Sequence, residues 1–227
     1  MIFSDYLIVC IPLANIEKLF HPAKRITFYF GSSFAVKNEN FNDYPKERII
    51  SAPSRFDLEQ RAEKALAFVR RHNMNEHYAL FVDYSIPSGS PRLFVWDFHQ
   101  KKVIARTYVM HGSGGRSTDK KPQFSNRPGS ECSALGRFYV TKAHGNRLKY
   151  SFRLKGMDID NQTAFARGLM IHSARWVDTW CWKKYIPLNR NCCQGCVTVS
   201  TRGMDYLWKL IRREKKALLL WNYCSIT

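Results

Sequence analysis

The sequence predicts a mainly β domain with antiparallel strands and a few helices at its margins. Between residues 78 and 109, three short segments rich in Val, Phe, Tyr and Ile alternate with turn-forming residues, the pattern of strands joined by tight turns. Segments with the apolar period of a helix lie on either side of the β-rich part. Of the 227 residues, 45% are hydrophobic, so the chain can bury a sizeable core.

Residues 1–56 are predicted to form an N-terminal appendage or cap, and residues 57–227 the main domain. The first segment is irregular, with a strand expected at 26–30 and polar, loop-favouring residues at 37–48. A helix capped by Ser54 or Asp57 is expected to lead into the main domain and to end within 70–73. The apolar residues on one face of this helix are Leu58, Ala62, Ala65, Leu66 and Val69.

The β-rich part is predicted to start with an antiparallel meander of three strands at 78–84, 92–97 and 103–109. A polar, glycine-rich loop follows at 111–129, and loops of this length usually carry function. The elements expected after this loop are strands at 137–142, 151–154 and 168–173, a helix at 202–216 and a closing strand at 217–223.

The chain carries a strong positive charge that favours polyanionic partners. It has 36 Lys and Arg residues against 18 Asp and Glu residues, a net charge of +18. Such a charge attracts nucleic acid, anionic lipid or an acidic wall polymer, and charge alone does not choose among them. No nucleic-acid motif with the required spacing occurs, so we expect no nucleic-acid partner.

The apolar run at residues 7–13 lacks the features of a signal peptide. Asp5 stands where a positive n-region is expected, Pro12 interrupts the run, and no small-residue cleavage site precedes Glu17. The run is also too short to span a bilayer. We therefore expect no stable membrane insertion, and export either by a signal missing from this sequence or by a route that needs none.

A histidine and a cysteine form the most informative pair in the sequence. His172 ends an apolar run, and Cys196 follows Gly195 in a cysteine-rich segment, 24 residues further on. This separation is too large for one helical face, so a loop must fold back to bring the two side chains together. Pairs of this kind are typical of enzymes that use a thiolate nucleophile and a histidine base.

The cysteines leave a second interpretation open. Cys193 and Cys196 have the spacing of metal ligands, and Cys181, Cys192 and His172 can complete a tetrahedral zinc site. The sequence lacks a second clean ligand pair. The total of seven cysteines is odd, which leaves at least one thiol unpaired if the others form disulfides.

Seven segments between residues 78 and 223 match, in order, those of a known family: FVDYS at 81–85, RLFVWD at 92–97, YVMHG at 108–112, FSN at 124–126, SALGRFY at 133–139, RGLMIHSA at 167–174 and QGC at 194–196. On these segments the chain resembles the L,D-transpeptidase catalytic domain of the YkuD type, in its murein L,D-transpeptidase branch. The resemblance implies a YkuD-like antiparallel β-sandwich or barrel with a few flanking helices over residues 57–227.

The resemblance also implies a reaction on the peptide stems of bacterial peptidoglycan. A thiolate attacks the L,D bond between stem residues three and four, releases D-alanine and forms a thioester acyl-enzyme. Transfer to an amine of a second stem gives a crosslink, transfer to a D-amino acid gives exchange, and transfer to water gives L,D-carboxypeptidase activity.

Carried over from the family pattern, Cys196 is the nucleophile and His172 the base. Ser173 is expected to orient the imidazole through its backbone carbonyl, and Gly195 to lie where backbone N–H groups form an oxyanion hole. The residues expected near the substrate are His111, Ser125, Asn126, Arg190 and Gln194. No metal and no cofactor are expected.

Residues around the nucleophile depart from the pattern. Cys193 stands where serine is usual, Val197 where proline is usual, and Gln194 where the better-known branch has histidine. We expect these positions to influence the choice of acceptor.

The expected partners are peptidoglycan tetrapeptide stems and D-amino acids, in the periplasm or cell envelope. An effector secreted into a competitor is one hypothesis, with an immunity protein or secretion-system component as a further partner; a resident wall enzyme is another. The alternative from a different class is a zinc-stabilised or catalytically inactive cell-wall binding module.

Overall fold

The computed structural model describes residues 55–141 and 150–225, with side chains described from Asp57 onward. The predicted appendage at 1–56, including the strand expected at 26–30, lies outside the described residues apart from the first turn of a helix. The elements in chain order are α1 (Arg55–Arg71), β1 (Tyr78–Asp83), β2 (Leu93–Asp97), β3 (Lys102–Thr107), β4 (Val109–Met110), β5 (Gly136–Val140), β6 (Ser151–Gly156), η2 (Ile159–Asn161), β7 (Met170–Ser173), α2 (Arg175–Trp180), β8 (Val197–Val199), α3 (Thr201–Arg213) and β9 (Leu219–Tyr223).

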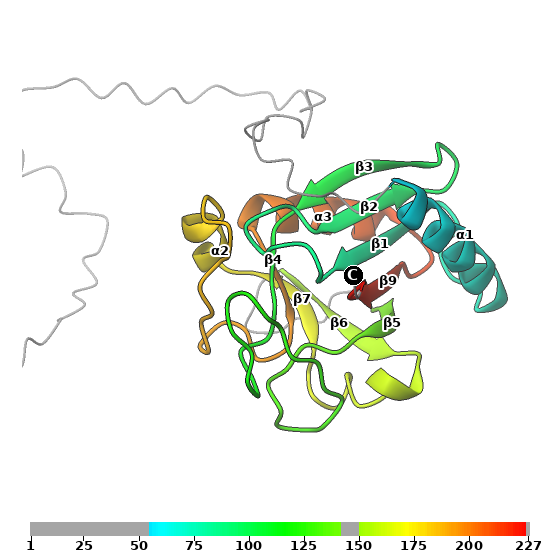
Figure 1. The fold of residues 1–227 in the computed structure, drawn as a ribbon. Helices are drawn as coiled ribbons and strands as arrows, with labels where there is room; N and C mark the ends of the chain where they lie inside the picture. The colour runs from blue at the N-terminus through cyan, green and yellow to red at the C-terminus, as the bar shows by residue number, and fades with distance from the viewer. Residues whose placement is uncertain (1–54, 142–149, 226–227) are drawn as a thin grey trace, which may run out of the picture. The chain divides into compact units, whose positions relative to one another are not determined.

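The framework of the described part is a curled sheet of nine strands with helices at its margins (Figure 1). The strand order is β3-β2-β1-β9-β5-β6-β7-β8-β4. The predicted antiparallel meander is confirmed as β1, β2 and β3. The predicted fold class, a mainly β domain of the YkuD type with few helices, is confirmed as well. Two pairs that the sequence did not predict, β1 with β9 and β7 with β8, are parallel.

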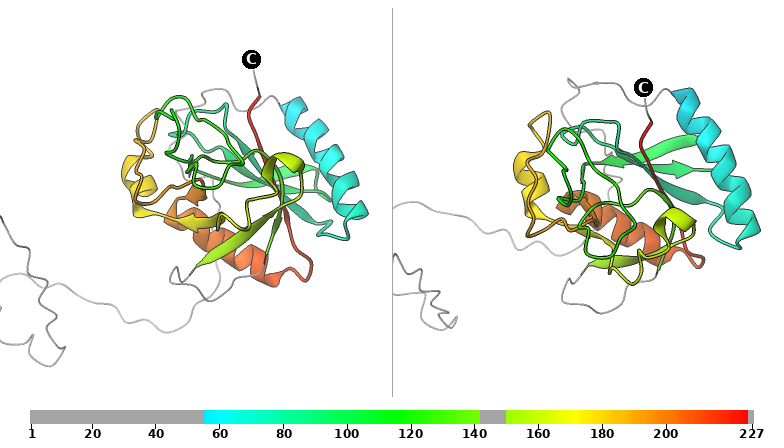
Figure 2. Two further views of the ribbon diagram at one scale, coloured as in Figure 1. Left: turned by 90° about the horizontal axis from the view of Figure 1, so that it is seen from below. Right: turned by 60° about the horizontal axis from the view of Figure 1, so that its bottom comes forward.

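Helices α1 and α3 cover opposite faces of the sheet around β1 (Figure 2). Side chains alternate along β1, so Leu80 and Val82 belong to the apolar cluster that includes α3, whereas Ala79 and Phe81 belong to the cluster that includes α1. The predicted apolar face of α1 is buried, except for Leu66, which is half-buried. Because side chains alternate between the two faces of β1, the strand packs against α3 on one face and against α1 on the other.

The strand predicted at 103–109 is interrupted at Tyr108. Its first part, β3, pairs with β2, and Val109 pairs with Val199 of β8 at the other end of the sheet. The chain therefore passes from one end of the curled sheet to the other within two residues. Residues 103–109 contain no Gly, Pro, Asn or Asp that would mark such a break in the sequence.

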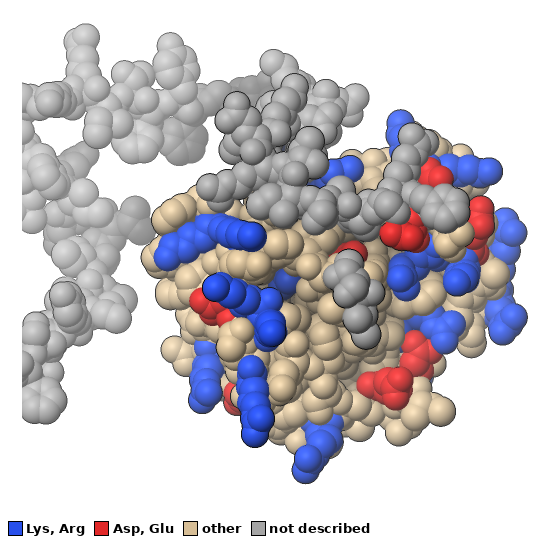
Figure 3. Space-filling view, in the orientation of Figure 1, with Lys and Arg blue, Asp and Glu red and all other residues tan. Residues whose placement is uncertain are grey.

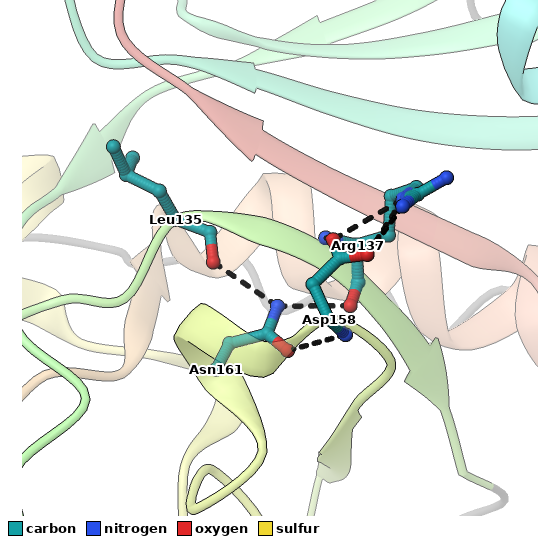
Figure 4. Close-up of polar contacts among 4 residues, drawn as sticks. All are labelled: Leu135, Arg137, Asp158 and Asn161. Carbon is teal, nitrogen blue, oxygen red and sulfur yellow. Dashed lines mark hydrogen bonds and ion pairs between the residues drawn. The ribbon is translucent and has the colours of Figure 1, made fainter.

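A network around the short helix η2 fixes the start of β5 (Figure 4). The buried Asn161 amide donates to the carbonyls of Leu135 and Arg137 and accepts from the Asp158 N–H. Asp158 also pairs with the Arg137 guanidinium. Gly136 has φ +100°, and a Cβ there would lie 2.7 Å from the Asn161 amide nitrogen. These contacts hold the long loop that precedes β5 at its C-terminal end.

Candidate active site

The histidine and the cysteine come from two strands that pair in parallel. In the register of β7 and β8, Ile171 lies opposite Val197 and His172 opposite Thr198. Side chains alternate along a strand, so His172, Thr198 and Cys196 share one face, and the other face enters the core. With strands about 4.8 Å apart and a rise of about 3.3 Å per residue, the backbones of His172 and Cys196 lie roughly 8 Å apart. The sheet thus presents an imidazole and a thiol side by side.

Hydrogen bonds on both ring nitrogens define the orientation of His172. The Nδ1 atom lies 3.1 Å from the Ser173 carbonyl oxygen, which can only accept, so Nδ1 carries the proton. The Nε2 atom faces the Thr198 hydroxyl at 3.3 Å. Burial lowers the pKa of His172, with the bond to Ser173 acting in the opposite sense. The ring is therefore a neutral base with an acceptor nitrogen on the site face.

The Cys196 thiol is also favoured in its neutral form. Burial raises its pKa, and a hydrogen bond from the Met170 backbone and the charge of Arg167 offset only part of that effect. The pKa shifts of His172 and Cys196 therefore both favour the uncharged pair over a thiolate–imidazolium pair. A thiol and an imidazole in these states are suited to transfer of the thiol proton to the imidazole during a reaction rather than before it.

The turn before Cys196 has room only for glycine. Gly195 has φ +98°, and a Cβ at this position would lie 2.5 Å from the Cys132 carbonyl oxygen. A Cβ on Gly112 would in turn lie 2.8 Å from the Gly195 Cα. Such close approach of three backbone segments needs residues without side chains. The turn carrying the nucleophile is thus packed directly against the loop that follows β4.

Cys193 occupies a different environment from Cys196. Its side chain is fully buried, and Sγ donates to the His111 carbonyl at 2.9 Å. The Thr198 hydroxyl and the Gly195 N–H also contact this sulfur. Burial raises the pKa of Cys193 to about 12. This thiol therefore holds the turn in place, while the candidate nucleophile is the half-buried Cys196. The role of Gly195 in an oxyanion hole stays a prediction.

His111 fixes the long loop. Its ring accepts from the Arg92 guanidinium at Nδ1 (3.1 Å) and donates from Nε2 to the Thr118 carbonyl (2.9 Å). Burial and the nearby Arg92 charge lower the pKa of His111 to about 3. Arg92 is itself fully buried and donates to the carbonyls of Ile86 and Val109. Both ring nitrogens of His111 are engaged within the protein, so its predicted contact with substrate stays untested.

The other residues predicted to bind substrate fall into two groups. Ser125 and Asn126 anchor the loop: the Ser125 carbonyl accepts from Arg167, and the Asn126 amide bonds the backbone of Ile159 and Thr163. Arg190 and Gln194 are exposed, Gln194 directly before Gly195. None of these four is shown to contact a substrate.

A cavity of about 560 Å³ opens beside the nucleophile turn. Its lining residues come from the loop after β4 and from the segment before the nucleophile: Ser113, Ser117, Thr118, Asp119, Lys120, Leu188 and Arg190. Ser113 links the cavity to the site because its N–H and hydroxyl both donate to the Cys193 carbonyl. Arg190 therefore lies at this cavity, and its predicted role in substrate binding stays a prediction.

Two residues of the site were missed by sequence reasoning, Arg167 and Thr198. Arg167 lies within the RGLMIHSA match but gives no sign of its position beside Cys196. Thr198 has a signal that could have been used, because residues two apart on a strand share a face and Thr198 follows Cys196 by two. Recognition of that signal would have required the three-residue strand β8 to be predicted.

The aromatic residues between base and nucleophile divide between core and surface. Trp176 and Trp180 pack in a buried cluster around Val177, and the Trp176 indole donates to the Pro187 carbonyl. Trp182 is 64% exposed, with Lys183 over its ring.

Figure 3 shows basic side chains gathered over α2 and the neighbouring loops, on the left of the view.

Within residues 57–141 and 150–225, no group of three or more His, Cys, Asp or Glu side chains is arranged to hold a metal ion. The six cysteines of this part are all free thiols. No helix among the described elements is long and apolar enough to cross a membrane.

The fold defines the class of this protein, a mainly β domain whose curled sheet places the Cys196 thiol and the His172 imidazole on one face. The chain belongs to the L,D-transpeptidase catalytic domain family of the YkuD type, whose sequence profile matches residues 54–221. This is a family of peptidoglycan-modifying enzymes. No curated protein matches the chain.

Among solved structures, the chain is similar to an L,D-transpeptidase from Xylanimonas cellulosilytica, with 16% identity and a TM-score of 0.39 over 64% of this chain and 60% of that one. It is also similar to the helical cell shape determining protein Pgp2 from Campylobacter jejuni, with 11% identity and a TM-score of 0.45 over 74% of this chain and 57% of Pgp2. The match thus spans about three fifths of these longer chains.

The burial of neutral His111 predicts that stability falls as the pH is lowered. The pKa of His111 is about 3 in the folded protein and about 6.5 when unfolded. Between these values the unfolded state binds more protons, so the free energy of unfolding decreases with falling pH, by at most about 1.4 kcal/mol per pH unit for this group. We expect His111→Gln to make that slope shallower in denaturant unfolding at pH 4, 5 and 6.

Replacement of the exposed His99 by Gln serves as the control and should leave the slope unchanged. Equal slopes for the wild type and His111→Gln would show that His111 does not titrate in this way.

Proposed function

We propose that this protein is a cysteine acyltransferase that cleaves the L,D bond between residues three and four of peptidoglycan stem peptides. Cys196 is the nucleophile and His172 the general base. The acyl group passes to an amine, a D-amino acid or water, which gives L,D-transpeptidase, exchange or L,D-carboxypeptidase activity. The observation that carries the proposal is the shared sheet face of Cys196 and His172, with the imidazole tautomer set by the Ser173 carbonyl.

Acylation begins with transfer of the Cys196 proton to Nε2 of His172. The Thr198 hydroxyl faces Nε2 at 3.3 Å and also reaches the Cys192 carbonyl at 3.2 Å, so a turn of this hydroxyl frees the nitrogen. The sulfur bonds to the carbonyl carbon of stem residue three, and the oxyanion is stabilised by backbone N–H groups at the Gly195 turn. As the C–N bond breaks, His172 returns the proton to the amine of the departing D-alanine.

Deacylation repeats these steps with another nucleophile. An amine or water gives its proton to His172 and bonds to the thioester carbon. The C–S bond breaks, and the sulfur recovers its proton from the imidazolium. The same two side chains therefore serve both halves of the reaction, and the acceptor that reaches the thioester decides the product.

The cavity beside the turn is suited to the anionic stem. Lys120 and Arg190 give it a basic rim, and Ser113, Ser117 and Thr118 offer hydroxyl groups. A stem peptide carries carboxylates that such groups bind by charge-assisted hydrogen bonds. We assign the predicted substrate-binding role of Arg190 to this cavity, with Gln194 at the acceptor side of the turn.

Mass spectrometry of peptidoglycan fragments tests the proposal. We expect the wild type to release or exchange the terminal D-alanine of tetrapeptide stems or to form dimers. Cys196→Ala removes the group that bonds to the stem, so turnover should fall on the order of 10³-fold or more. Cys193→Ser is the matched control, because it retains a polar group in the buried position and should retain most of the activity. Identical products from wild type and Cys196→Ala would end the enzyme proposal.

The neutral thiol–imidazole pair predicts the pH dependence of acylation. Only unprotonated His172 can accept the thiol proton, and burial lowers its pKa below the ordinary value of about 6.5. The acid limb of kcat/KM should therefore lie below pH 6.5, with no loss of rate between pH 6.5 and 7.5. A preformed thiolate–imidazolium pair would instead give fast iodoacetamide alkylation of Cys196 at pH 6, which we expect to be slow.

We further propose that the protein acts in the cell envelope, as an effector delivered to a target cell. The net charge of +18 suits an anionic wall. Directed to the periplasm of a susceptible bacterium, the wild type should arrest growth, whereas Cys196→Ala and the wild type kept in the cytoplasm should not. A neighbouring gene for an immunity protein or secretion component would agree with delivery. A harmless periplasmic wild type would contradict it and favour a resident wall enzyme.

A further inference from the structure

Arg167 places a positive charge against the turn that carries Cys196. Its Nη1 donates to the Ser125 carbonyl and its Nη2 to the Cys132 carbonyl, each at 2.6 Å. A Cβ on Gly195 would lie 3.1 Å from Nη2, so the guanidinium contacts the backbone directly before the nucleophile. The charge lies within electrostatic reach of the Cys132 and Cys196 thiols. Arg167 thus joins the long loop to the nucleophile turn.

No acidic side chain of the described residues forms an ion pair with this guanidinium. Among the ion pairs between described side chains, none involves Arg167. Its position is half-buried, and withdrawal from water lowers its pKa. A desolvated cation is costly unless hydrogen bonds or an anion compensate it. The two carbonyl oxygens supply part of this compensation, and a Cys196 thiolate would supply the missing negative charge.

Three ionisable groups near Cys196, namely Tyr84, Cys193 and His172, are neutral near pH 7. Burial raises the pKa of both Tyr84 and Cys193 to about 12, and His172 on the adjacent strand has a lowered pKa. Within the described part, Arg167 is therefore the cation that acts on Cys196.

We propose that Arg167 stabilises the thiolate form of Cys196 and so assists transfer of its proton to His172. The inference rests on the proposed function, in which Cys196 is the nucleophile. When the S–H bond breaks, the proton goes to Nε2 of His172 and the electron pair remains on a sulfur next to the guanidinium. His172 is neutral before the proton transfer, so it provides no positive charge that would stabilise the thiolate at that stage. Arg167 is in this sense a positioning residue, acting through the nucleophile.

The rate of iodoacetamide alkylation of Cys196, followed by peptide mass spectrometry from pH 6 to 10, tests the proposal without any wall substrate. Only the thiolate reacts, so the rate at a fixed pH reports the thiol pKa. An opposite charge within about 4–6 Å shifts a pKa by about one unit or more. We expect Cys196 of Arg167→Gln to be alkylated about tenfold more slowly than that of the wild type at pH 8. In Arg167→Lys, which retains the charge, the alkylation rate should stay within about threefold of the wild-type rate.

Arg153→Gln is the matched control. Arg153 also donates to a backbone carbonyl, that of Phe165, at 2.6 Å, but it does not act on the Cys196 thiol. Its alkylation rate should equal that of the wild type, and thermal unfolding confirms that each variant is folded. A wild-type rate in folded Arg167→Gln would overturn the proposal. So would a tenfold loss in folded Arg167→Lys, since it would show that the charge is not what matters.

The outcome is separable from the proposed function. If Cys196→Ala retains full turnover, Cys196 is not the nucleophile, whatever Arg167 does to its thiol. If Cys196→Ala is inactive and Arg167→Gln alkylates normally, the enzyme proposal stands and the role of Arg167 falls.

Discussion

The parallel pairing of β7 and β8 is the constraint on which the site depends. Parallel neighbours cannot be joined by a tight turn and need a crossover of a dozen or more residues. Residues 174–196 form this crossover, which explains why base and nucleophile are far apart in sequence and adjacent in space. The crossover is held by its own contacts: Asp178 of α2 accepts from the Thr201 N–H at the start of α3, and the buried Val177 belongs to an apolar cluster.

Much of the fold could be predicted from the sequence because its elements have strong local patterns. The meander strands are rich in β-formers and bounded by turn residues, and α1 and α3 have apolar faces. Strand β8 has only three residues, of which Thr198 alone faces the site. This is too short for the two-residue alternation of a strand to be recognised in the sequence. The partners of each strand depend on contacts across the whole chain. The His172–Cys196 pair could be predicted because its residue types and the segments around it match a family pattern. The position of Arg167 beside Cys196 depends on contacts across the chain and could not.

Two guanidinium groups shape the electrostatics of the site. Arg92 is fully buried and donates to the carbonyls of Ile86 and Val109 and to His111. Arg167 similarly donates to carbonyls, those of Ser125 and Cys132. Backbone carbonyls satisfy the donors without cancelling the charge as a carboxylate would. Burial together with the Arg92 charge lowers the pKa of His111, whereas burial alone lowers that of His172. The charge of Arg167 in turn favours a negative charge on Cys196.

The contact between the backbones of Gly112 and Gly195 has a consequence for evolution and engineering. Because a Cβ on Gly112 would approach the Gly195 Cα, and one on Gly195 the Cys132 carbonyl, the loop and the nucleophile turn form a single mechanical body. A segment grafted at either place would have to keep glycine at the contact, because any other residue would bring its Cβ against the facing backbone. Substitutions near this contact should therefore be correlated across the two segments, whereas exposed positions such as Lys120 and Arg190 can change independently.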